Sequence, residues 1–316
     1  MARTDTAARA RPRVGLVGSG TWGRLILRDL VSLGCDVWAV ARSDRSVSNA
    51  REHGAHCIVA GVAELPRDLD GYVVAAPTSV HAQIVTELLE RQRPIYVEKP
   101  LCNDPEDAAR LAREGNGRVF VMDKWRYHPG IRVLADIAAS GELGTVRSIH
   151  SYRLGWGLTH DDVDVTWVLL PHDLSIALHI LGQLEEPLWA AAEVDPDGQV
   201  SGFQLGLRGS PSVNCEVSSN AAVDLRSVQV HFEKGAAAMH GSYSEHVLVR
   251  RGAGLRARRG GEVEKRPIGN EMPLLSELRA FVDHLHGGPP PFSSVAEGAR
   301  IVGIIAQART LAGLSD

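Results

Sequence analysis

The sequence predicts a two-domain α/β protein, with a parallel sheet flanked by helices followed by an α+β part built on a mostly antiparallel open sheet. A chain of 316 residues is long enough for two ordinary domains. In its first part, strand-like and helix-like segments alternate, as in parallel sheets. In its second part, alternating apolar segments follow one another with few helices between them. We place the boundary near Asp123, so that the domains cover residues 13–122 and 123–316.

The first domain is predicted to contain five strands with helices between them. The strand segments are rich in β-branched and other apolar residues. They lie at Val14–Val17, Asp36–Val40, Gly71–Ala76, Pro94–Val97 and Arg118–Met122. Helices are expected at Thr21–Leu33, Val80–Gln92 and Pro105–Arg113. The last of these has a clear start, because Asp104 suits the N-cap and Pro105 suits the first helical turn.

The second domain is predicted to begin with helices and to continue as a sheet. Its helical segments are Pro129–Ser140, Thr166–Leu181 around Pro171, and the two closing segments Leu274–His286 and Ser294–Leu314. Alternating polar and apolar residues predict strands in the rest of the domain. These strands lie at Thr145–Arg153, Gly202–Leu207, Ser212–Val217, Ser227–Phe232, Ala236–His240 and His246–Arg250.

Composition and charge exclude several classes of protein. The net charge is −4, which gives no electrostatic basis for binding nucleic acid or an anionic membrane. No apolar run approaches the length of a membrane span. Residues 1–12 contain arginines but no apolar stretch follows them, so we expect a disordered tail and a cytoplasmic protein. His53, His56 and Cys57 lie close together without a further group of ligands, so we expect no metal site.

A glycine-rich turn predicts a dinucleotide site. Gly18-Ser19-Gly20-Thr21-Trp22-Gly23 follows an apolar strand and opens a helix, which is the context that gives this spacing its meaning. Gly18 permits the tight turn, Gly20 lets the backbone approach a pyrophosphate, and Gly23 allows close packing of helix and strand. The pyrophosphate is expected at the helix N-terminus. Thr21 and Trp22 belong to the same turn, where Trp22 either packs under the loop or contacts the ligand.

The end of the second strand favours NADP(H) over NAD(H). An NAD-selective enzyme usually places an acid about twenty residues past the loop, where it bonds the ribose 2′-hydroxyl. Here Arg42 stands nineteen residues after Gly23, followed by Ser43. A guanidinium suits a 2′-phosphate, with Ser43 as a further donor. NAD(H) remains possible, with Arg42 in a solvated loop and Asp44 bonding the ribose.

Motifs spread along the chain resemble the glucose-fructose oxidoreductase / inositol dehydrogenase / MocA family. The most specific is Glu98-Lys99-Pro100, at the end of a strand. The others are Ala75-Ala76-Pro77-Thr78-Ser79-Val80-His81, Arg126-Tyr127-His128-Pro129, Ser140-Gly141-Glu142-Leu143-Gly144 and Pro171-His172-Asp173-Leu174. The resemblance implies a Rossmann-type domain, with Ala76, Pro77, Thr78, His81 and Glu98 flanking the cofactor, and a second domain whose open sheet forms homodimers or homotetramers.

The resemblance implies that Lys99 and His172 share proton transfer beside the nicotinamide. The chemistry agrees, because moving a hydride to or from a carbon requires a partner that moves a proton on the attached oxygen. Lys99 lies where ligands bind in open α/β folds. The family places an aspartate one helical turn before the histidine, and this chain has Val168 there. Another acid is then needed, and the candidates are Asp161, Asp162 and Asp164.

Candidates for substrate contact are Arg126, Tyr152, Trp156, Trp167 and Asp164, which the resemblance places near the pocket. Aromatic faces and an arginine suit a hydroxyl-rich or phosphorylated small molecule, and core packing is the alternative for each. Three functions are compatible with these residues. The first is an oxidoreductase acting on a secondary alcohol or ketone of a sugar, sugar nucleotide or cyclitol. The second is an imine reductase in natural-product biosynthesis, and the third is a nucleotide-binding sensor or scaffold with impaired catalysis.

Overall fold

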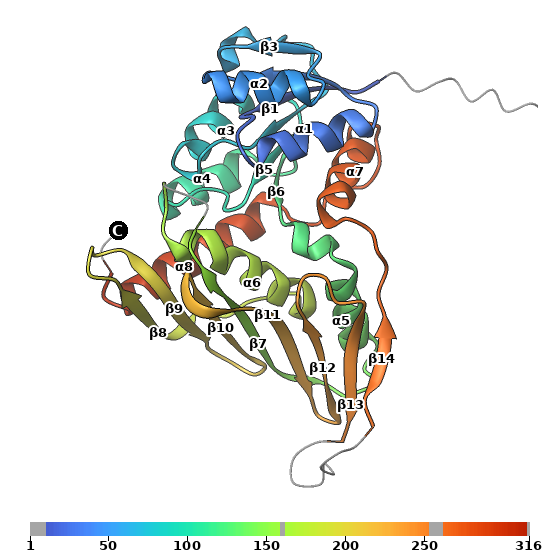
Figure 1. Cartoon of the computed structure of the whole chain (residues 1–316), viewed down its shortest axis with the longest axis vertical. Helices are drawn as coiled ribbons and strands as arrows, with labels where there is room; N and C mark the ends of the chain where they lie inside the picture. Colours follow the sequence, from blue (N-terminus) through green and yellow to red (C-terminus); the bar gives the residue numbers. More distant parts are fainter. Residues whose placement is uncertain (1–10, 159–161, 253–261, 315–316) are drawn as a thin grey trace, which may run out of the picture.

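The computed structural model of the chain describes residues 11–158, 162–252 and 262–314. Two sheets lie one above the other along the long axis, each with its own set of helices (Figure 1). The first sheet uses β1–β6 and the second uses β7–β14, which confirms the predicted parallel sheet followed by a mostly antiparallel one. No helix within the described ranges is long and apolar enough to cross a membrane. The expected tail lies almost entirely outside these ranges, but Arg11 and Pro12 already contact Asp36.

The first sheet is wholly parallel, with the strand order β3-β2-β1-β4-β5-β6. The order changes direction between β1 and β4, and ligands bind outside the carboxyl ends of the strands at such a point. The strands are β1 (Arg13–Val17), β2 (Asp36–Val40), β3 (Cys57–Val59), β4 (Gly71–Val74), β5 (Ile95–Glu98) and β6 (Val119–Met122).

Helices on both faces cover this sheet. They are α1 (Gly23–Ser32), α2 (Asp44–Glu52), α3 (His81–Leu89) and α4 (Pro105–Glu114), with short 3₁₀ turns η1 (Val62–Glu64), η2 (Thr78–Val80) and η3 (Lys124–Tyr127). The predicted start of α4 is confirmed, since the Asp104 carboxylate accepts a hydrogen bond from the Asp107 amide at 2.7 Å. The sequence analysis did not predict α2 and β3. Only Asn49 and Ala50 are buried in α2, so it has no apolar stripe to reveal it.

The second sheet has the order β14-β13-β12-β11-β7-β10-β9-β8 and is antiparallel except between β7 and β10. The sequence analysis did not predict the two edge strands, β8 and β14. Their residues are largely exposed, so apolar alternation is weak. The strands are β7 (Val146–Trp156), β8 (Pro187–Val194), β9 (Val200–Leu207), β10 (Ser212–Ser218), β11 (Asn220–Phe232), β12 (Gly235–His240), β13 (His246–Arg251) and β14 (Glu264–Pro267).

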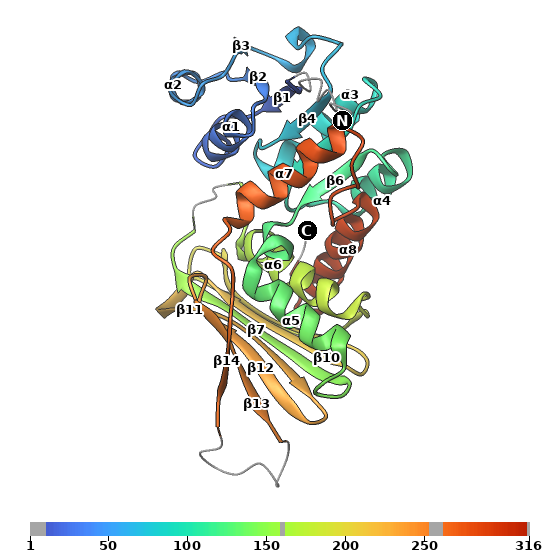
Figure 2. The same ribbon diagram turned by 90° about the vertical axis from the view of Figure 1, so that its right-hand side faces the viewer.

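Helices cover one face of the second sheet and leave the other open (Figure 2). The covering helices are α5 (Pro129–Ser140), α6 (Val165–Leu181) and α8 (Val295–Leu311), whereas α7 (Pro273–Leu285) packs against α1. The last segments of the chain therefore return to the first domain. The Val121 amide in β6 donates to the Ser293 carbonyl at 2.9 Å. A single hydrophobic cluster runs from Val97 through Ile305 to Phe203, so one core fixes both sheets relative to each other.

Candidate active site between the two sheets

The three glycines of the turn after β1 have the roles that their spacing predicts. Gly18 has φ +99°, and an added Cβ would lie 2.6 Å from the Ala75 carbonyl oxygen. At Gly23 an added Cβ would lie 2.1 Å from the Gly18 oxygen. Beside Gly20, by contrast, no atom lies within 4 Å of an added Cβ. The open side of the turn at Gly20 and the N-terminus of α1 therefore leave room and N–H groups for a pyrophosphate.

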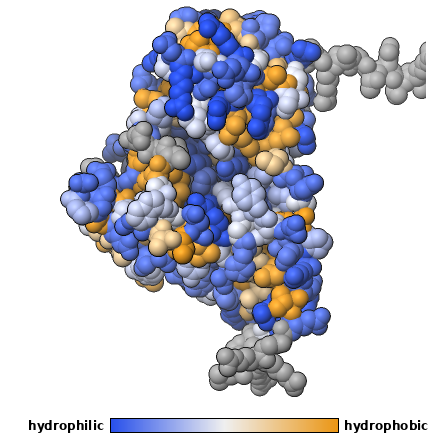
Figure 3. All heavy atoms as spheres, viewed as in Figure 1, coloured by the Kyte–Doolittle hydropathy of each residue, from blue (hydrophilic) through white to orange (hydrophobic). Residues whose placement is uncertain are grey.

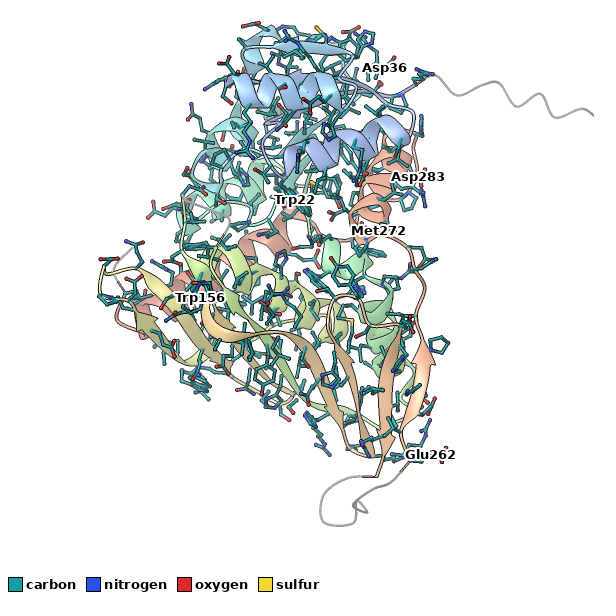
Figure 4. All side chains as sticks on the ribbon, viewed as in Figure 1. Trp22, Asp36, Trp156, Glu262, Met272 and Asp283 are labelled. Carbon is teal, nitrogen blue, oxygen red and sulfur yellow. The ribbon has the colours of Figure 1, made fainter. Side chains whose placement is uncertain are left out.

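Side chains of neighbouring elements hold this turn in place. The Ser19 hydroxyl donates to the Ser46 carbonyl at 2.9 Å, and the Asn49 amide donates to the Ser19 carbonyl at 2.8 Å. On the other side, the Trp22 indole N–H donates to the Glu98 carboxylate. Trp22 thus links the glycine turn to the end of β5, and it lies at the mouth of the space between the domains (Figure 4).

At the end of β2, Arg42 is exposed, and its Nε donates to the Ala60 carbonyl at 3.3 Å. Ser43 is the N-cap of α2, where its hydroxyl accepts from the Ser46 amide at 3.2 Å. Arg45 reaches the Thr21 hydroxyl at 3.4 Å. The Arg45 guanidinium and the N-terminus of α2 therefore lie beside the glycine turn, whereas the hydrogen bond of Arg42 is with the loop after β3. Asp44, the alternative ribose ligand, is the exposed first residue of α2.

The loop after β4 is held by a buried histidine. The His81 ring nitrogens lie 2.8 Å from the Ala76 carbonyl oxygen and 2.9 Å from that of Pro100. Burial lowers the pKa of His81, while the two carbonyl oxygens oppose that change because each accepts from an N–H. His81 therefore joins the Ala76–Pro77–Thr78 loop to the loop after β5. It can shape a cofactor site through these backbones, while its own polar atoms are already engaged.

Lys99 follows β5 and reaches across to the second domain. Its ammonium donates to the carbonyl of Val168 in α6 at 3.0 Å. Pro171 has no N–H, so α6 lacks the backbone hydrogen bond that residue 171 would otherwise donate. Burial lowers the pKa of Lys99 to about 8, and Lys124 and Arg153 act in the same direction. A lysine with such a pKa can both give and take a proton near neutral pH.

Glu98 is the carboxylate nearest to Lys99. It accepts from the Lys99 amide at 3.1 Å as well as from Trp22. Burial raises the pKa of Glu98, while the charges of Lys99 and Lys124 oppose that change. Lys124 lies at the end of β6, with its ammonium 4.2 Å from the centre of the Trp22 ring. The end of the parallel sheet thus carries two lysines beside Glu98, and the buried carboxyl groups of Asp123 and Glu277 also act on them.

His172 lies one helical turn after Val168, so both face the same side of α6. Its Nδ1 is buried without a hydrogen-bond partner among the described residues. Burial holds the pKa of His172 well below its usual value, and the charges of Lys99 and Arg153 lower it further. A buried imidazole nitrogen without a partner is a group for which a ligand atom is expected. The Trp125 ring lies 6.4 Å from the imidazole, edge to face.

An ion pair underlies this site. Arg153 in β7 makes two hydrogen bonds to the Asp173 carboxylate, at 3.1 and 3.2 Å, and both side chains are buried. Its guanidinium also lies 4.7 Å from the centre of the Trp125 ring. Asp173 therefore bonds away from its neighbour His172, as two adjacent helical residues must.

Three of the predicted substrate contacts are engaged elsewhere. Arg126 donates to Ser293 and to Glu297, each at 3.0 Å, and so joins η3 to α8. Asp164 is the N-cap of α6 and pairs with Arg309 at 2.6 Å. Trp167 is buried in α6, with Arg309 5.8 Å from its ring centre. These three side chains stabilise the frame of the site.

Tyr152 and Trp156 lie on the opposite face of the sheet from Arg153, because side chains alternate along a strand. Trp156 is 77% exposed at the end of β7 (Figure 4). Of the acids proposed to replace the one missing at Val168, Asp162 accepts from the Ser79 amide at 3.3 Å, and Asp161 lies outside the described residues. Neither observation supplies a carboxylate next to His172.

The sequence analysis did not single out Lys124, Trp125 and Arg226 as site residues. Lys124 had a usable signal, since it follows the last parallel strand and so shares an edge with Lys99. Arg226 had none, because its place depends on the register of β11 against β7. In the ranges that the structure covers, no group of three or more His, Cys, Asp or Glu side chains is placed to hold a metal ion.

The fold and the glycine turn define a two-domain protein whose first domain is of the dinucleotide-binding Rossmann type. Residues 12–121 match the family model described as an oxidoreductase family with an NAD-binding Rossmann fold. The first domain is thus similar to the Gfo/Idh/MocA oxidoreductase family.

Curated relatives match mainly in the same part of the chain. Inositol 2-dehydrogenase 3 of Saccharopolyspora erythraea is 30% identical over 44% of this chain and 44% of its own length. A dTDP-3,4-didehydro-2,6-dideoxy-alpha-D-glucose 3-reductase of Actinomadura kijaniata is 30% identical over 46% of each chain. This chain thus spans less than half the length of both relatives.

Two solved structures share the whole fold. UDP-N-acetylglucosamine 3-dehydrogenase from Acidithiobacillus ferrooxidans has a TM-score of 0.81 and 20% identity over 96% of this chain and 98% of its own. A levoglucosan dehydrogenase in complex with NADH has a TM-score of 0.85 and 15% identity over 96% and 97%. At these identities the likeness establishes the architecture of both domains.

Proposed function

We propose that the protein is an NAD(P)-dependent oxidoreductase acting on a secondary alcohol or ketone of a sugar, sugar nucleotide or cyclitol. The observation that carries the proposal is the hydrogen bond from Lys99, at the carboxyl end of the parallel sheet, to Val168, one helical turn before His172 in α6. The names of the relatives, which include inositol dehydrogenases and a sugar-nucleotide reductase, support this substrate class.

The nicotinamide, when bound, supplies the hydride or accepts it. The structure fits such a cofactor, since the Gly20 side of the turn is open and the N-terminus of α1 is adjacent. Gly18, Gly20, Thr21, Trp22 and Gly23 would hold the pyrophosphate, and the loop from Ala76 to Thr78 would flank the nicotinamide. Glu98 positions Trp22 through the indole hydrogen bond.

Lys99 is proposed to move the proton on the reacting oxygen. As a neutral amine it takes the proton from an alcohol, and as an ammonium it gives one to a ketone. His172 is neutral because of its burial, and its unpartnered Nδ1 is available to bond the same oxygen or its neighbour. The Val168 carbonyl holds the lysine in place, where the family usually has an acid.

Replacing Gly20 with alanine tests the cofactor site. The new Cβ meets no atom of the protein, so stability should stay within about 0.5 kcal/mol of the wild type. The methyl group would occupy the approach to the pyrophosphate, so we expect nucleotide affinity to fall at least about tenfold. Fluorescence titration with NADPH and NADH measures the affinities. Gly303→Ala in α8 is the matched control, since its added Cβ also meets nothing. Unchanged affinity in Gly20→Ala would contradict this placement of the cofactor.

We propose a preference for NADP(H), because Arg42 stands at the end of β2, where an NAD-selective enzyme usually has an acid, and Arg45 reaches Thr21 of the glycine turn. NADPH should bind at least about tenfold more tightly than NADH, which corresponds to about 1.4 kcal/mol. Arg42→Asp should remove that preference, while Arg51→Asp in the last turn of α2 should not. Equal binding of the two cofactors by the wild type would show that the preference is wrong.

We further propose that the open face of the second sheet joins copies of the chain into a homodimer or homotetramer. No helix covers this face, and Trp189 on β8 is one of its partly exposed apolar side chains (Figure 2). Light scattering of the purified protein measures its oligomeric state. A monomer at micromolar concentration would exclude the proposed dimer or tetramer.

A further inference from the structure

Two arginines face each other inside the second domain. Arg153 in β7 is directly opposite Arg226 in β11 in the antiparallel register. Residues in this relation point to the same face of the sheet, with Cβ atoms about 5 Å apart, and like charges there are destabilising. Arg153 is buried and pairs with Asp173 of α6, so this is the face beneath the helices and the candidate active site.

The two arginines differ in how their charges are balanced. Arg153 has Asp173 as a bidentate partner. Arg226 donates to the Leu154 carbonyl at 2.8 Å, and no carboxylate of the described residues lies within ion-pair distance of it. Burial and the charge of Arg153 lower the pKa of Arg226, while Asp173 and Asp224 oppose this from a distance. Arg226 is therefore a half-buried cation without a direct counter-ion.

Further cations lie on the other side of His172. Lys99 and Lys124 both act on the single carboxylate of Glu98, and together with Arg153 and Arg226 they lower the pKa of the His172 imidazole. The surface is hollowed between the two domains (Figure 3). An uncharged sugar would leave Arg226 uncompensated. An anion would offset its charge and make two parallel hydrogen bonds with its planar guanidinium.

We propose that the substrate carries an anionic group, a carboxylate or a phosphate, that binds Arg226 beside the carbon that faces Lys99 and His172. This inference rests on the proposed oxidoreductase function and adds the charge of the substrate to it. The cofactor phosphates are assigned to the glycine turn, which contacts α2 and β4 in the first domain, whereas Arg226 belongs to the sheet of the second domain. The two anion sites are therefore separate.

Calorimetric titration of the protein saturated with NADP⁺ or NAD⁺ tests the proposal. The probes are D-glucuronate, D-glucose 6-phosphate and D-glucose, which share a pyranose ring and differ in charge. At least one anionic probe should bind at least about tenfold more tightly than glucose, and the better of the two identifies carboxylate or phosphate. If both anions bind no more tightly than glucose, the proposal is overturned.

Variants of Arg226 test whether this residue causes the preference for an anionic probe. Arg226→Gln should reduce the preference for the anion to less than about twofold, and Arg226→Lys should keep part of it because the charge remains. Arg208→Gln, at an exposed position in the same domain, should leave the preference intact. A preference that survives Arg226→Gln in folded protein overturns the assignment. If Arg226→Gln does not fold, Arg226→Lys decides the assignment. A preference for the anion as large in Arg226→Lys as in the wild type would then overturn it.

The nucleotide titration separates this inference from the proposed function. Normal nucleotide binding without a preference for anionic probes refutes only the anionic substrate. The opposite result is a protein that binds none of NADPH, NADP⁺, NADH and NAD⁺ but prefers an anionic probe, and loses that preference in Arg226→Gln. This result refutes the oxidoreductase function and leaves Arg226 as an anion site.

Discussion

Replacing Lys99 with methionine is expected to slow turnover by about 100- to 10,000-fold, the range that general acid–base groups contribute. The methionine side chain fills similar space but cannot carry a proton. Nucleotide affinity should change by less than about threefold, because the cofactor is assigned to the glycine turn and the strand-end loops. Steady-state rates on a substrate found by screening sugars, sugar nucleotides and cyclitols measure the first effect, and fluorescence titration measures the second.

Lys265→Met is the matched control, since Lys265 is exposed on β14, and its rate should equal that of the wild type. The pH profile supplies a second check. With the pKa of Lys99 lowered to about 8, alcohol oxidation needs the neutral amine, so its rate should rise as pH passes through about 8. Ketone reduction needs the ammonium, so its rate should fall over the same interval. A Lys99→Met enzyme that keeps both its rate and this profile would remove Lys99 from the mechanism.

Replacing Arg153 with methionine is expected to lower the free energy of unfolding by about 3–5 kcal/mol, the cost of leaving one partner of a buried ion pair without the other. Asp173 is 1% exposed and would lose both hydrogen bonds from the guanidinium. The lost stacking on Trp125 adds to the effect. Urea denaturation followed by circular dichroism measures the change.

Two comparisons separate the ion pair from the loss of a long side chain. Arg147→Met, on the same strand, breaks an exposed pair with Glu233 and should cost less than about 1 kcal/mol. The double variant Arg153→Met/Asp173→Leu should recover most of the stability, because no unpaired charge stays buried. Equal costs for Arg153→Met and Arg147→Met would show that burial of the Arg153–Asp173 pair contributes nothing.

At Val168 the chain differs from the family that it resembles, yet Lys99 keeps a hydrogen-bond partner there. A valine side chain cannot hold an ammonium, but its backbone carbonyl does. Pro171 removes the helical donor of the Trp167 carbonyl, one residue before the Val168 carbonyl that accepts from Lys99. Since a carbonyl cannot take a proton, the relay is left to Lys99 and His172, which agrees with the proposed mechanism.

Local patterns were sufficient for the glycine turn, for the strands and helices of both domains apart from α2, β3, β8 and β14, and for the position of Lys99. Each of these depends on residues close together in the chain. The turn needs glycine at Gly18 and Gly23 because backbone atoms lie within 3 Å of an added Cβ. Buried strands are apolar on both faces, so their sequences identify them.

Tertiary structure decided which polar side chains meet at the site. The pleat of β7 placed Arg153 under the helices and Tyr152 on the open face, although the two are neighbours in the sequence. The register of β11 brought Arg226 opposite Arg153, and the domain packing brought Lys99 to Val168. The sequence by itself determined the fold class and the cofactor turn, because these follow from local backbone and apolar patterning. The charge and the contacts around His172 depend on pairings between residues far apart in the chain, which no local pattern encodes.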